Sequence, residues 1–452
     1  MNSLPQQWIV KEIGQVGEVV AGGTPSTKKN EYWGMDVCWI TPLDLSGYKE
    51  KYISKGRKSL TKLGLEKSSA RLIPKGSILF SSRAPIGYVA IAANELATNQ
   101  GFKNLIPSPI IESDFLYYYF KSIKKMAYEL ASGTTFKELS AARFAKIPVP
   151  VPHKKEQQVI VEKIEELFSD LDNAVENLQK ARAQLKVYRQ SILKNAFEGK
   201  LTNKNVKEGE LPKGWKLVRI EEIADVGTGA TPLKSNKSYY ENGKIPWITS
   251  GALNDLFVRD ATDFVNEKAI RETNLKVYPK HTLLLAMYGE GKTRGKCSEL
   301  LIDACTNQAI AAIYFTNHDN RIKPYLKYYL LKNYDDIRKL ASGGVQPNLN
   351  LGIVKNTILS VPPSFEEQKA IVAEIESRFS VCDQMEETIE TSLKQAEALR
   401  QSILKQAFEG KLTEQWRKDH TDLISGENSA VALLAKIKTE KEKLTNKKRS
   451  RK

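Results

Sequence analysis

The sequence predicts an α+β protein built from two copies of one module. Each copy begins with a mixed, mainly β domain and ends in a long helix, and the two helices pair as an antiparallel coiled coil. Three observations predict this fold: an internal repeat, short apolar runs bounded by turn residues, and two stretches of forty-five residues without glycine or proline. We therefore expect a pseudo-twofold internal repeat, with its axis across the helices.

The repeat is clearest at the ends of the two helices. Residues 189–202 read RQSILKNAFEGKLT and residues 400–413 read RQSILKQAFEGKLT, so thirteen of fourteen positions are identical. Shorter words recur at a spacing of about 210 residues: Leu-Pro-x-x-Trp at 4 and 211, Thr-Pro at 24 and 231, Trp-Ile-Thr at 39 and 247, Thr-Asn-Gln at 98 and 306, and Ala-Ser-Gly at 131 and 341. The chain is therefore a tandem duplication of one module.

The first part of each module predicts a mainly β domain. Residues 1–152 and 211–363 are rich in glycine, proline, threonine, tyrosine and tryptophan, and their short apolar runs are bounded by turn residues. A helix is expected late in each domain, over 115–130 and 325–340. Proline clusters at 147–152 and 361–363 then close the two domains.

The second part of each module predicts a long helix, over 154–198 and 365–409. Ser364 and Glu367 form a potential capping box, and Gly199 and Gly410 occupy the positions of C-terminal stops. Apolar residues recur at alternating spacings of three and four, as in a coiled-coil seam: Ile160, Ile164, Leu167, Leu171, Ala174, Leu178, Ala181 and Leu185, and Ile371, Ile375, Phe379, Cys382, Met385, Ile389, Leu393 and Ala396. The alternative is two amphipathic helices, each packed only on its own domain.

Helix length favours the antiparallel arrangement. Each helix would be roughly 67 Å long, and the second domain begins soon after the first helix ends. The second helix must therefore run back to pack on the first. The expected organisation is a first domain (1–152), a helical region with linker (153–210), a second domain (211–363), a second helical region (364–413) and a C-terminal extension with a basic tail (414–452).

The net charge of +16 indicates a polyanionic partner. It is distributed unevenly: +8 in 1–152, +1 in 153–210, +6 in 211–363, −6 in 364–432 and +7 in 433–452. Basic domains and neutral to acidic helices favour domains that bind nucleic acid and helices that bind protein or each other; the alternative is ordinary surface lysine. The helix ends agree while the domain loops diverge, which fits two copies of one protein partner and two different nucleic-acid half-sites.

Other classes of protein are disfavoured. The chain lacks a membrane-spanning run and a signal-peptide pattern at its start, so a cytoplasmic protein is expected. Four scattered cysteines and four scattered histidines predict neither a disulfide framework nor a metal site. Residues 286–293 resemble a phosphate-binding loop, but Ala286 replaces its first glycine and a poor helix start follows, so a basic loop that touches DNA is the better interpretation. Amino-methyltransferase, nucleotide-binding and hydrolase motifs are absent, so we expect no catalysis by the chain alone.

These motifs together resemble the specificity (S) subunit, HsdS, of a type I restriction-modification system. The resemblance rests on two divergent basic domains, each opened by LPxxW and closed by prolines, and on the doubled helix end RQSILKxAFEGKLT. The tail, TEQWR from Thr413 and DLISGENS from Asp422, is similar to the C-terminus of enterobacterial members. The resemblance covers essentially the whole chain.

The resemblance implies a function in DNA recognition. Two target recognition domains would each read one half of a bipartite double-stranded DNA sequence, while the helices set the spacer and dock two modification subunits. Those subunits carry S-adenosylmethionine and methylate adenine; restriction subunits, which use ATP and Mg, add cleavage. This chain itself would bind no cofactor. The rivals are an architectural, double-headed DNA-binding protein without a methyltransferase partner and, third, an independent enzyme.

Candidate DNA-binding residues lie in the loops of both domains. Arg83 and Arg294 are the preferred candidates for guanine contacts, because arginine is the commonest specific reader, although phosphate contact or solvation is an alternative. The repeated Thr-Asn-Gln is open to interpretation as a structural turn or a backbone contact. The full set is Thr27, Lys28, Arg83, Asn99, Gln100, Thr135 and Lys137 in the first domain, and Lys234, Lys292, Arg294, Lys296, Asn307, Gln308 and Gln346 in the second.

Overall fold

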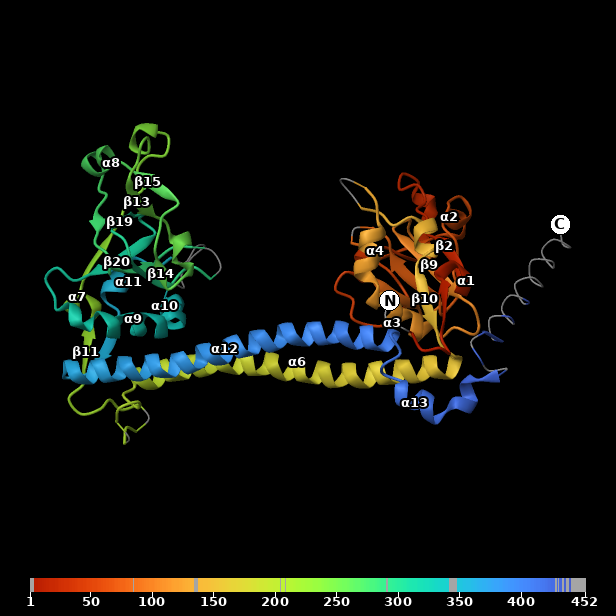
Figure 1. Cartoon of the computed structure of the whole chain (residues 1–452). Helices are drawn as coiled ribbons and strands as arrows, with labels where there is room; N and C mark the ends of the chain where they lie inside the picture. Colours follow the sequence, from red (N-terminus) through yellow and green to blue (C-terminus); the bar gives the residue numbers. More distant parts are fainter. Residues whose placement is uncertain are drawn as a thin grey trace. The chain divides into compact units, whose positions relative to one another are not determined.

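A computed structural model gives the fold of the chain (Figure 1). It describes residues 4–426 apart from 84, 134–136, 204, 208, 290–291 and 341–347, and beyond 426 it describes 429, 431, 432, 435 and 439. Internal contacts divide the chain into two compact units. Unit 1 comprises Met1–Asn177 with Thr391–Lys452, and unit 2 comprises Leu178–Glu390. Each unit thus combines one globular domain with the adjoining halves of both long helices.

The globular part of unit 1 contains ten strands among its described residues. They are β1 (Ile9–Glu12), β2 (Gly17–Ala21), β3 (Trp33–Ile40), β4 (Tyr52–Ile53), β5 (Lys58–Leu60), β6 (Ile78–Ser81), β7 (Val89–Ala92), β8 (Ala97–Thr98), β9 (Phe102–Pro107) and β10 (Pro148–Val151). They form a five-stranded sheet in the order β2-β9-β6-β7-β4, a three-stranded sheet β5-β3-β8 and a two-stranded ribbon β1-β10. The helices are α1 (Ile13–Val16), α2 (Lys62–Glu66), α3 (Ser113–Ser122), α4 (Lys124–Leu130) and α5 (Ala141–Ala145), with 3-10 turns η1 (Asn30–Tyr32) and η2 (Pro42–Leu45).

The globular part of unit 2 repeats this arrangement. Its strands are β11 (Lys216–Arg219), β12 (Asp225–Thr228), β13 (Ile245–Ile248), β14 (Phe257–Val258), β15 (Asp263–Val265), β16 (Val277–Tyr278), β17 (Leu283–Ala286), β18 (Cys297–Leu300), β19 (Ala304–Thr306), β20 (Ile310–Tyr314) and β21 (Ile358–Val361). The sheets are β12-β20-β17-β18-β14, β15-β13-β19-β16 and β11-β21, so only β16 is additional. The helices are α7 (Ile220–Ile223), α8 (Glu267–Glu272), α9 (Lys323–Lys332), α10 (Tyr334–Leu340) and α11 (Leu351–Lys355), with η3 (Lys237–Tyr239), η4 (Ser250–Asn254) and η5 (Asn320–Ile322). The predicted α+β class and internal repeat are confirmed.

The central strand of each five-stranded sheet separates two apolar cores. In β6, Ile78 and Phe80 face a core shared with α3 and the long helices, whereas Leu79 faces the core under the second sheet. In β17, Leu283 and Leu285 likewise face the core shared with the long helices, whereas Leu284 faces the core under the second sheet. Because successive side chains of a strand point to opposite faces, a strand covered on both sides reads as a continuous apolar run. This explains the short apolar runs of the sequence.

The two helices expected late in the domains are each broken in two. Ile123 interrupts the first with φ −93° and ψ 9°, so α3 ends and α4 begins there. Asn333 interrupts the second in the same way, between α9 and α10. Ile123 and Ala127, on either side of the break, both belong to the core of unit 1.

The long helices are α6 (Lys154–Phe197) and α12 (Phe365–Phe408), each continuous and one residue shorter than predicted. Gly199 and Gly410 adopt φ values of +74° and +78°, the left-handed conformation of a helix stop. At each stop the glycine N–H and the next N–H bond back to the last turn, as in a Schellman motif. The short helix α13 (Glu414–Asp419) and the turn η6 (Thr421–Ile424) follow α12.

The helices run antiparallel within each unit. In unit 1, Arg400 pairs with Asp172 while Thr413, further along the chain, bonds Glu156 near the start of α6. In unit 2, Arg182 lies 3.7 Å from Glu386 and Arg189 lies 2.5 Å from Asp383. Each helix also packs on the core of the adjoining domain. The helices are nevertheless paired in both units, so the alternative of unpaired helices is wrong. Of the predicted seam residues, only Ala174 and Met385 are exposed.

The start of each domain is tied to the start of the helix that follows the domain. The indole N–H of Trp8 donates to Glu156 over 2.9 Å, and that of Trp215 donates to Glu367 over 3.1 Å. The predicted capping box is half formed: the Glu367 N–H bonds the Ser364 hydroxyl, while the Glu367 carboxylate is engaged by Trp215 and by Asn203. The tryptophan of each LPxxW word therefore joins the start of its domain to the first turn of the long helix.

Glu299 is expected to give unit 2 a specific sensitivity to acid. Its side chain is 11% exposed, and burial alone would raise its pKa, but hydrogen bonds from Lys327, His281 and Lys323 outweigh this and lower the pKa from 4.5 to about 2. A depressed carboxyl pKa stabilises the fold above pH 4.5, and that stability is lost as the pH falls towards 2. We expect Glu299→Gln to cost about 2 kcal/mol at pH 7 and nothing at pH 2. Denaturant unfolding of both proteins across this range would show the difference shrinking; a constant difference would contradict the assignment.

Candidate nucleic-acid interface

Four loops of the first domain meet at one place. The Gly23 N–H bonds the carbonyl of Thr98, which joins the loop after β2 to the loop after β8. The Ser82 N–H bonds the carbonyl of Gly101 over 2.7 Å, and the Leu139 N–H bonds the carbonyl of Ser82 over 3.0 Å. The hairpin loop between β6 and β7 therefore lies between the other loops. Most of the predicted DNA-binding residues of this domain are in these loops.

The candidates of the first domain differ in exposure. Thr27, Lys28, Gln100 and Lys137 are exposed, whereas Arg83 and Asn99 are half-buried; Thr135 lies outside the described residues. The Lys137 ammonium lies 4.2 Å from the centre of the Tyr128 ring. Arg83 lies 3.8 Å from the Glu138 carboxylate, which leaves its guanidinium only loosely held.

Sequence reasoning missed Lys103, which is 7% exposed and bonds Glu138 over 3.2 Å. Its ammonium also lies 3.4 Å from the Gln100 carbonyl oxygen. This lysine sits within β9 and therefore reads as a strand residue. Its contacts with Glu138 and with the Gln100 carbonyl show that it belongs to the loop cluster.

The second domain brings the corresponding loops together by corresponding bonds. The Met287 N–H bonds the carbonyl of Ala309 over 2.8 Å, and the Leu349 N–H bonds the carbonyl of Met287 over 3.1 Å. Asn307 and Gln308 lie at this junction. Lys234 lies in the loop after β12 and is exposed. Gln346 lies outside the described residues. The two domains thus present the same loop framework with different side chains.

The other three candidates of the second domain, Lys292, Arg294 and Lys296, lie apart from this junction. They are held by backbone and side-chain contacts: Tyr334 bonds the Lys292 carbonyl, Arg338 bonds the Arg294 carbonyl, and Lys296 bonds Asn254. Lys292 and Lys296 line a groove of about 600 Å³ with Arg189 and Phe379 of the helix pair. The Arg294 Nε is buried and has no hydrogen-bond partner among the described residues.

The resemblance of residues 286–293 to a phosphate-binding loop is not supported by the geometry. Strands β17 and β18 are antiparallel neighbours, and the segment between them is a hairpin loop. In the described part of this loop no helix follows Thr293, so no helix N-terminus faces a phosphate. The sequence-based preference for a basic loop over a nucleotide site is consistent with this geometry. Contact between this loop and DNA stays a prediction.

Metal ligands and activated thiols, among the residues that the structure describes, are the groups that would point to cofactor or nucleophile chemistry. Within the described ranges, no three histidine, cysteine or acidic side chains gather as a metal site requires. Burial raises the pKa of the Cys297 thiol to about 12 and that of Cys305 to about 11, so neither is a ready thiolate. None of the described helices has the length and apolarity that a bilayer-spanning segment needs.

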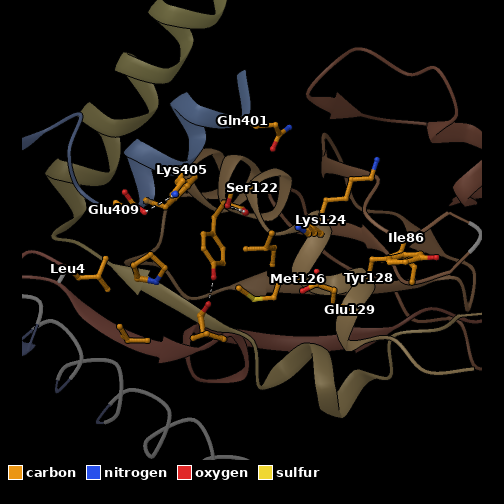
Figure 2. Close-up of a pocket in the computed structure, with 17 residues that line it drawn as sticks. Leu4, Ile86, Ser122, Lys124, Met126, Tyr128, Glu129, Gln401, Lys405 and Glu409 are labelled. Carbon is orange, nitrogen blue, oxygen red and sulfur yellow. Dashed lines mark hydrogen bonds and ion pairs between the residues drawn. The ribbon is translucent and has the colours of Figure 1, made fainter. Parts of the chain in front are cut away.

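An apolar groove of about 950 Å³ lies elsewhere in unit 1 (Figure 2). Its walls come from α4, with Met126 and Tyr128, from Leu4 near the N-terminus, and from the last turns of α12. Figure 2 shows Lys405 and Glu409 at the α12 side of this groove. Both residues belong to the word that recurs at the end of α6, so the groove borders the repeated surface of the helices.

The duplicated sequence and the duplicated framework match one protein family. The family model described as "Type I restriction modification DNA specificity domain" matches residues 5–186 and again residues 212–395. The chain belongs to the type I restriction-modification DNA specificity family. One matched stretch lies within each module of the repeat, and each ends shortly before the repeated helix end.

Curated relatives within this specificity family are similar over most of their length. The type I restriction enzyme MjaIX specificity subunit of Methanocaldococcus jannaschii is 34% identical over 374 residues, which cover 80% of this chain and 85% of that protein. The EcoKI specificity subunit of Escherichia coli K12 is 27% identical over 482 residues, covering 100% of this chain and 99% of the relative.

Solved structures support the specificity-family fold. One chain, from a study of complex assembly and conformational transition in a type I R-M system, has a TM-score of 0.68 at 19% identity and covers 91% of this chain and 100% of its own length. The HsdS subunit from Thermoanaerobacter tengcongensis has a TM-score of 0.57 at 19% identity, with coverage of 90% and 98%. At these identities the likeness concerns the fold alone.

Proposed function

We propose that this chain is the DNA sequence-specificity subunit of a type I restriction-modification enzyme. Its two domains each read one half of a bipartite double-stranded DNA target. The observation that carries this proposal is the loop framework, which is the same in both domains but holds different residues. A common scaffold with divergent loops is what two readers of different sequences require.

The helices serve the assembly. At the repeated helix ends, Gln190 and Lys194 on α6 are exposed, and Gln401 and Lys405 occupy the same positions on α12 and are also exposed. Core packing does not constrain exposed side chains, so their identity favours a shared external contact. We assign this surface to two modification subunits, and we assign to α6 and α12, which both continue from one unit into the other, the task of fixing the spacer.

Catalysis belongs to the partners in this proposal. Modification subunits supply S-adenosylmethionine and methylate adenine, and restriction subunits use ATP and Mg for cleavage. The specificity chain contributes binding and positioning, does not itself carry out the reaction, and works in the cytoplasm. The basic domains supply the electrostatic attraction that DNA binding needs.

Adenine methylation in the host genome tests the function directly. With this chain and its modification partner present, single-molecule methylome sequencing is expected to show methylated adenines in a split motif about one DNA turn across. The motif should vanish when the gene for this chain is deleted and the partner is kept. Methylation that persists without this chain, or a motif without two halves, would refute the proposal.

Arg294→Ala is expected to affect one half-site only. We propose that Arg294 and, in the first domain, Arg83 contact guanines, each contributing roughly 1–3 kcal/mol of discrimination. Arg294→Ala should then relax or weaken the half read by the second domain, and Arg83→Ala the other half. Methylome sequencing of the two variants provides the matched comparison. Equal loss at both halves in each variant would argue for unspecific contacts.

A further inference from the structure

The same threonine–glutamine contact occurs once in each domain. The Thr24 hydroxyl donates to the Gln100 side-chain oxygen, and the Thr231 hydroxyl donates to the Gln308 side-chain oxygen. These residues come from two repeated words, Thr-Pro and Thr-Asn-Gln, that are far apart in the sequence. Among the loops that differ between the domains, this polar contact is retained in both.

Each contact is built into a rigid crossing of two loops. A Cβ on Gly22 would lie 1.8 Å from the Asn99 carbonyl oxygen, and one on Gly229 would lie 1.6 Å from the Thr306 carbonyl oxygen. Glycine is therefore required where the loops cross. The indole N–H groups of the repeated tryptophans hold the same loops: Trp39 bonds the Gly23 carbonyl over 3.0 Å, and Trp247 bonds the Ala230 carbonyl over 3.1 Å.

The asparagine and the glutamine of each Thr-Asn-Gln word have different tasks. The Asn99 side-chain oxygen accepts from the Gly101 N–H over 2.9 Å, and that of Asn307 accepts from the Ala309 N–H over 3.1 Å. Both asparagines therefore shape the turn. Gln100 and Gln308 are exposed, and among the described residues their Nε2 groups have no hydrogen-bond partner.

An exposed donor that is fixed in the same way in both domains fits a ligand that both domains share. Bases do not qualify, because the two half-sites differ, whereas the sugar-phosphate backbone is the same everywhere. Amide side chains such as glutamine are regular donors to phosphate oxygens. The bond from threonine to Oε1 leaves Nε2 as the outward donor.

We propose that Gln100 and Gln308 each donate from Nε2 to a DNA phosphate oxygen, one contact in each half-site. Thr24 and Thr231 are the positioning residues that hold the amides in register. This inference rests on the proposed function, since it presupposes a bipartite DNA target. The repeated Thr-Pro and Thr-Asn-Gln residues would then position each domain on the duplex through a contact that does not depend on the DNA sequence.

The first test uses Gln100→Glu and Gln308→Glu in the full complex with its modification partner. Glutamate keeps the shape of glutamine and still accepts from the threonine hydroxyl, but it loses the donor and carries a negative charge. DNA affinity should fall at least tenfold in each variant, with an unchanged unfolding midpoint. A glutamine that only supports the loop would tolerate this change, so unchanged affinity would overturn the proposal.

Neutral variants then separate a phosphate contact from a base contact. Gln100→Leu and Gln308→Leu should each weaken binding about fivefold without changing the methylated motif. The salt dependence of binding should stay the same, because a neutral amide displaces no counterion. A changed base preference in the methylome of either variant would identify a base reader and overturn the proposal.

Single methylphosphonate substitutions in the target DNA locate the contact. In the unaltered complex, replacing one particular phosphate in each half-site should weaken DNA binding more than replacing either neighbouring phosphate does. Gln100→Leu should abolish that extra loss in one half-site only, and Gln308→Leu in the other only. Extra losses that persist in both variants would exclude the contact. Failure of the unaltered complex to bind a bipartite site would instead refute the proposed function.

Discussion

Arg417→Ala is expected to destabilise unit 1 by about 3 kcal/mol, because it leaves a buried carboxylate without its cation. The Arg417 side chain is 9% exposed and its Nη1 lies 2.5 Å from the Glu156 Oε1, while the same guanidinium donates to the Gly410 carbonyl. Glu156 itself is fully buried and, within the described part of the chain, otherwise accepts only from the Trp8 indole and the Thr413 hydroxyl. Two neutral donors do not balance a full charge in this setting.

Unit 2 provides the control. Glu367 occupies the equivalent position but is only half-buried, so water helps to solvate its charge, and its carboxylate is met by the neutral amide of Asn203 over 3.1 Å instead of an arginine. Asn203→Ala should therefore cost only about 1 kcal/mol. The double variant Glu156→Gln with Arg417→Ala should recover part of the loss, since it removes the stranded charge.

Hydrogen exchange of the whole chain localises the effect. Faster exchange is expected in peptides that cover β1 and β10 of unit 1, with no change in those that cover β11 and β21 of unit 2. Uniform loss of protection in both ribbons would contradict a local effect of the Glu156–Arg417 ion pair. An Arg417→Ala chain as stable as the parent would show that the ion pair contributes nothing net.

The features that could be predicted from the sequence are those that depend on residues close together in the chain. The repeat, the helix stops and the fully buried strands follow from short words and local periodicity. Gly199 and Gly410 are examples, because a left-handed helix stop depends only on the adjoining turn. The break at Ile123 was not predicted, since no glycine or proline marks it in the sequence.

The features that the sequence does not predict join residues that are distant in the chain. Glu156 and Arg417 are separated by 261 positions, and each reads as an ordinary surface residue of a helix. The division of the second domain's candidates has the same origin: Arg294 is placed by contacts with α10, whereas Gln308 is placed by Thr231. No local pattern encodes these pairings, because they arise from the packing of the loops.

Charge reversal on the repeated helix surface is expected to change the number of bound modification subunits. Lys194 is 62% and Lys405 is 74% exposed, and the two occupy identical positions in the repeated helix ends. If each forms part of one docking surface, Lys194→Glu or Lys405→Glu should weaken one of two sites roughly a hundredfold. The single variants should then bind one modification subunit, and the double variant none.

Native mass spectrometry of the complexes counts the subunits, and the repeat itself supplies the control. Lys186 is exposed on α6, and its counterpart on α12 is Glu397, so the two copies already differ in charge there. Lys186→Glu only makes α6 resemble α12 and should leave two subunits bound. DNA binding by the separate chain should survive in all variants, because the altered residues lie on the helices. If Lys186→Glu lost a subunit as readily as Lys194→Glu, general electrostatics of the helices, and not the repeated surface, would govern docking.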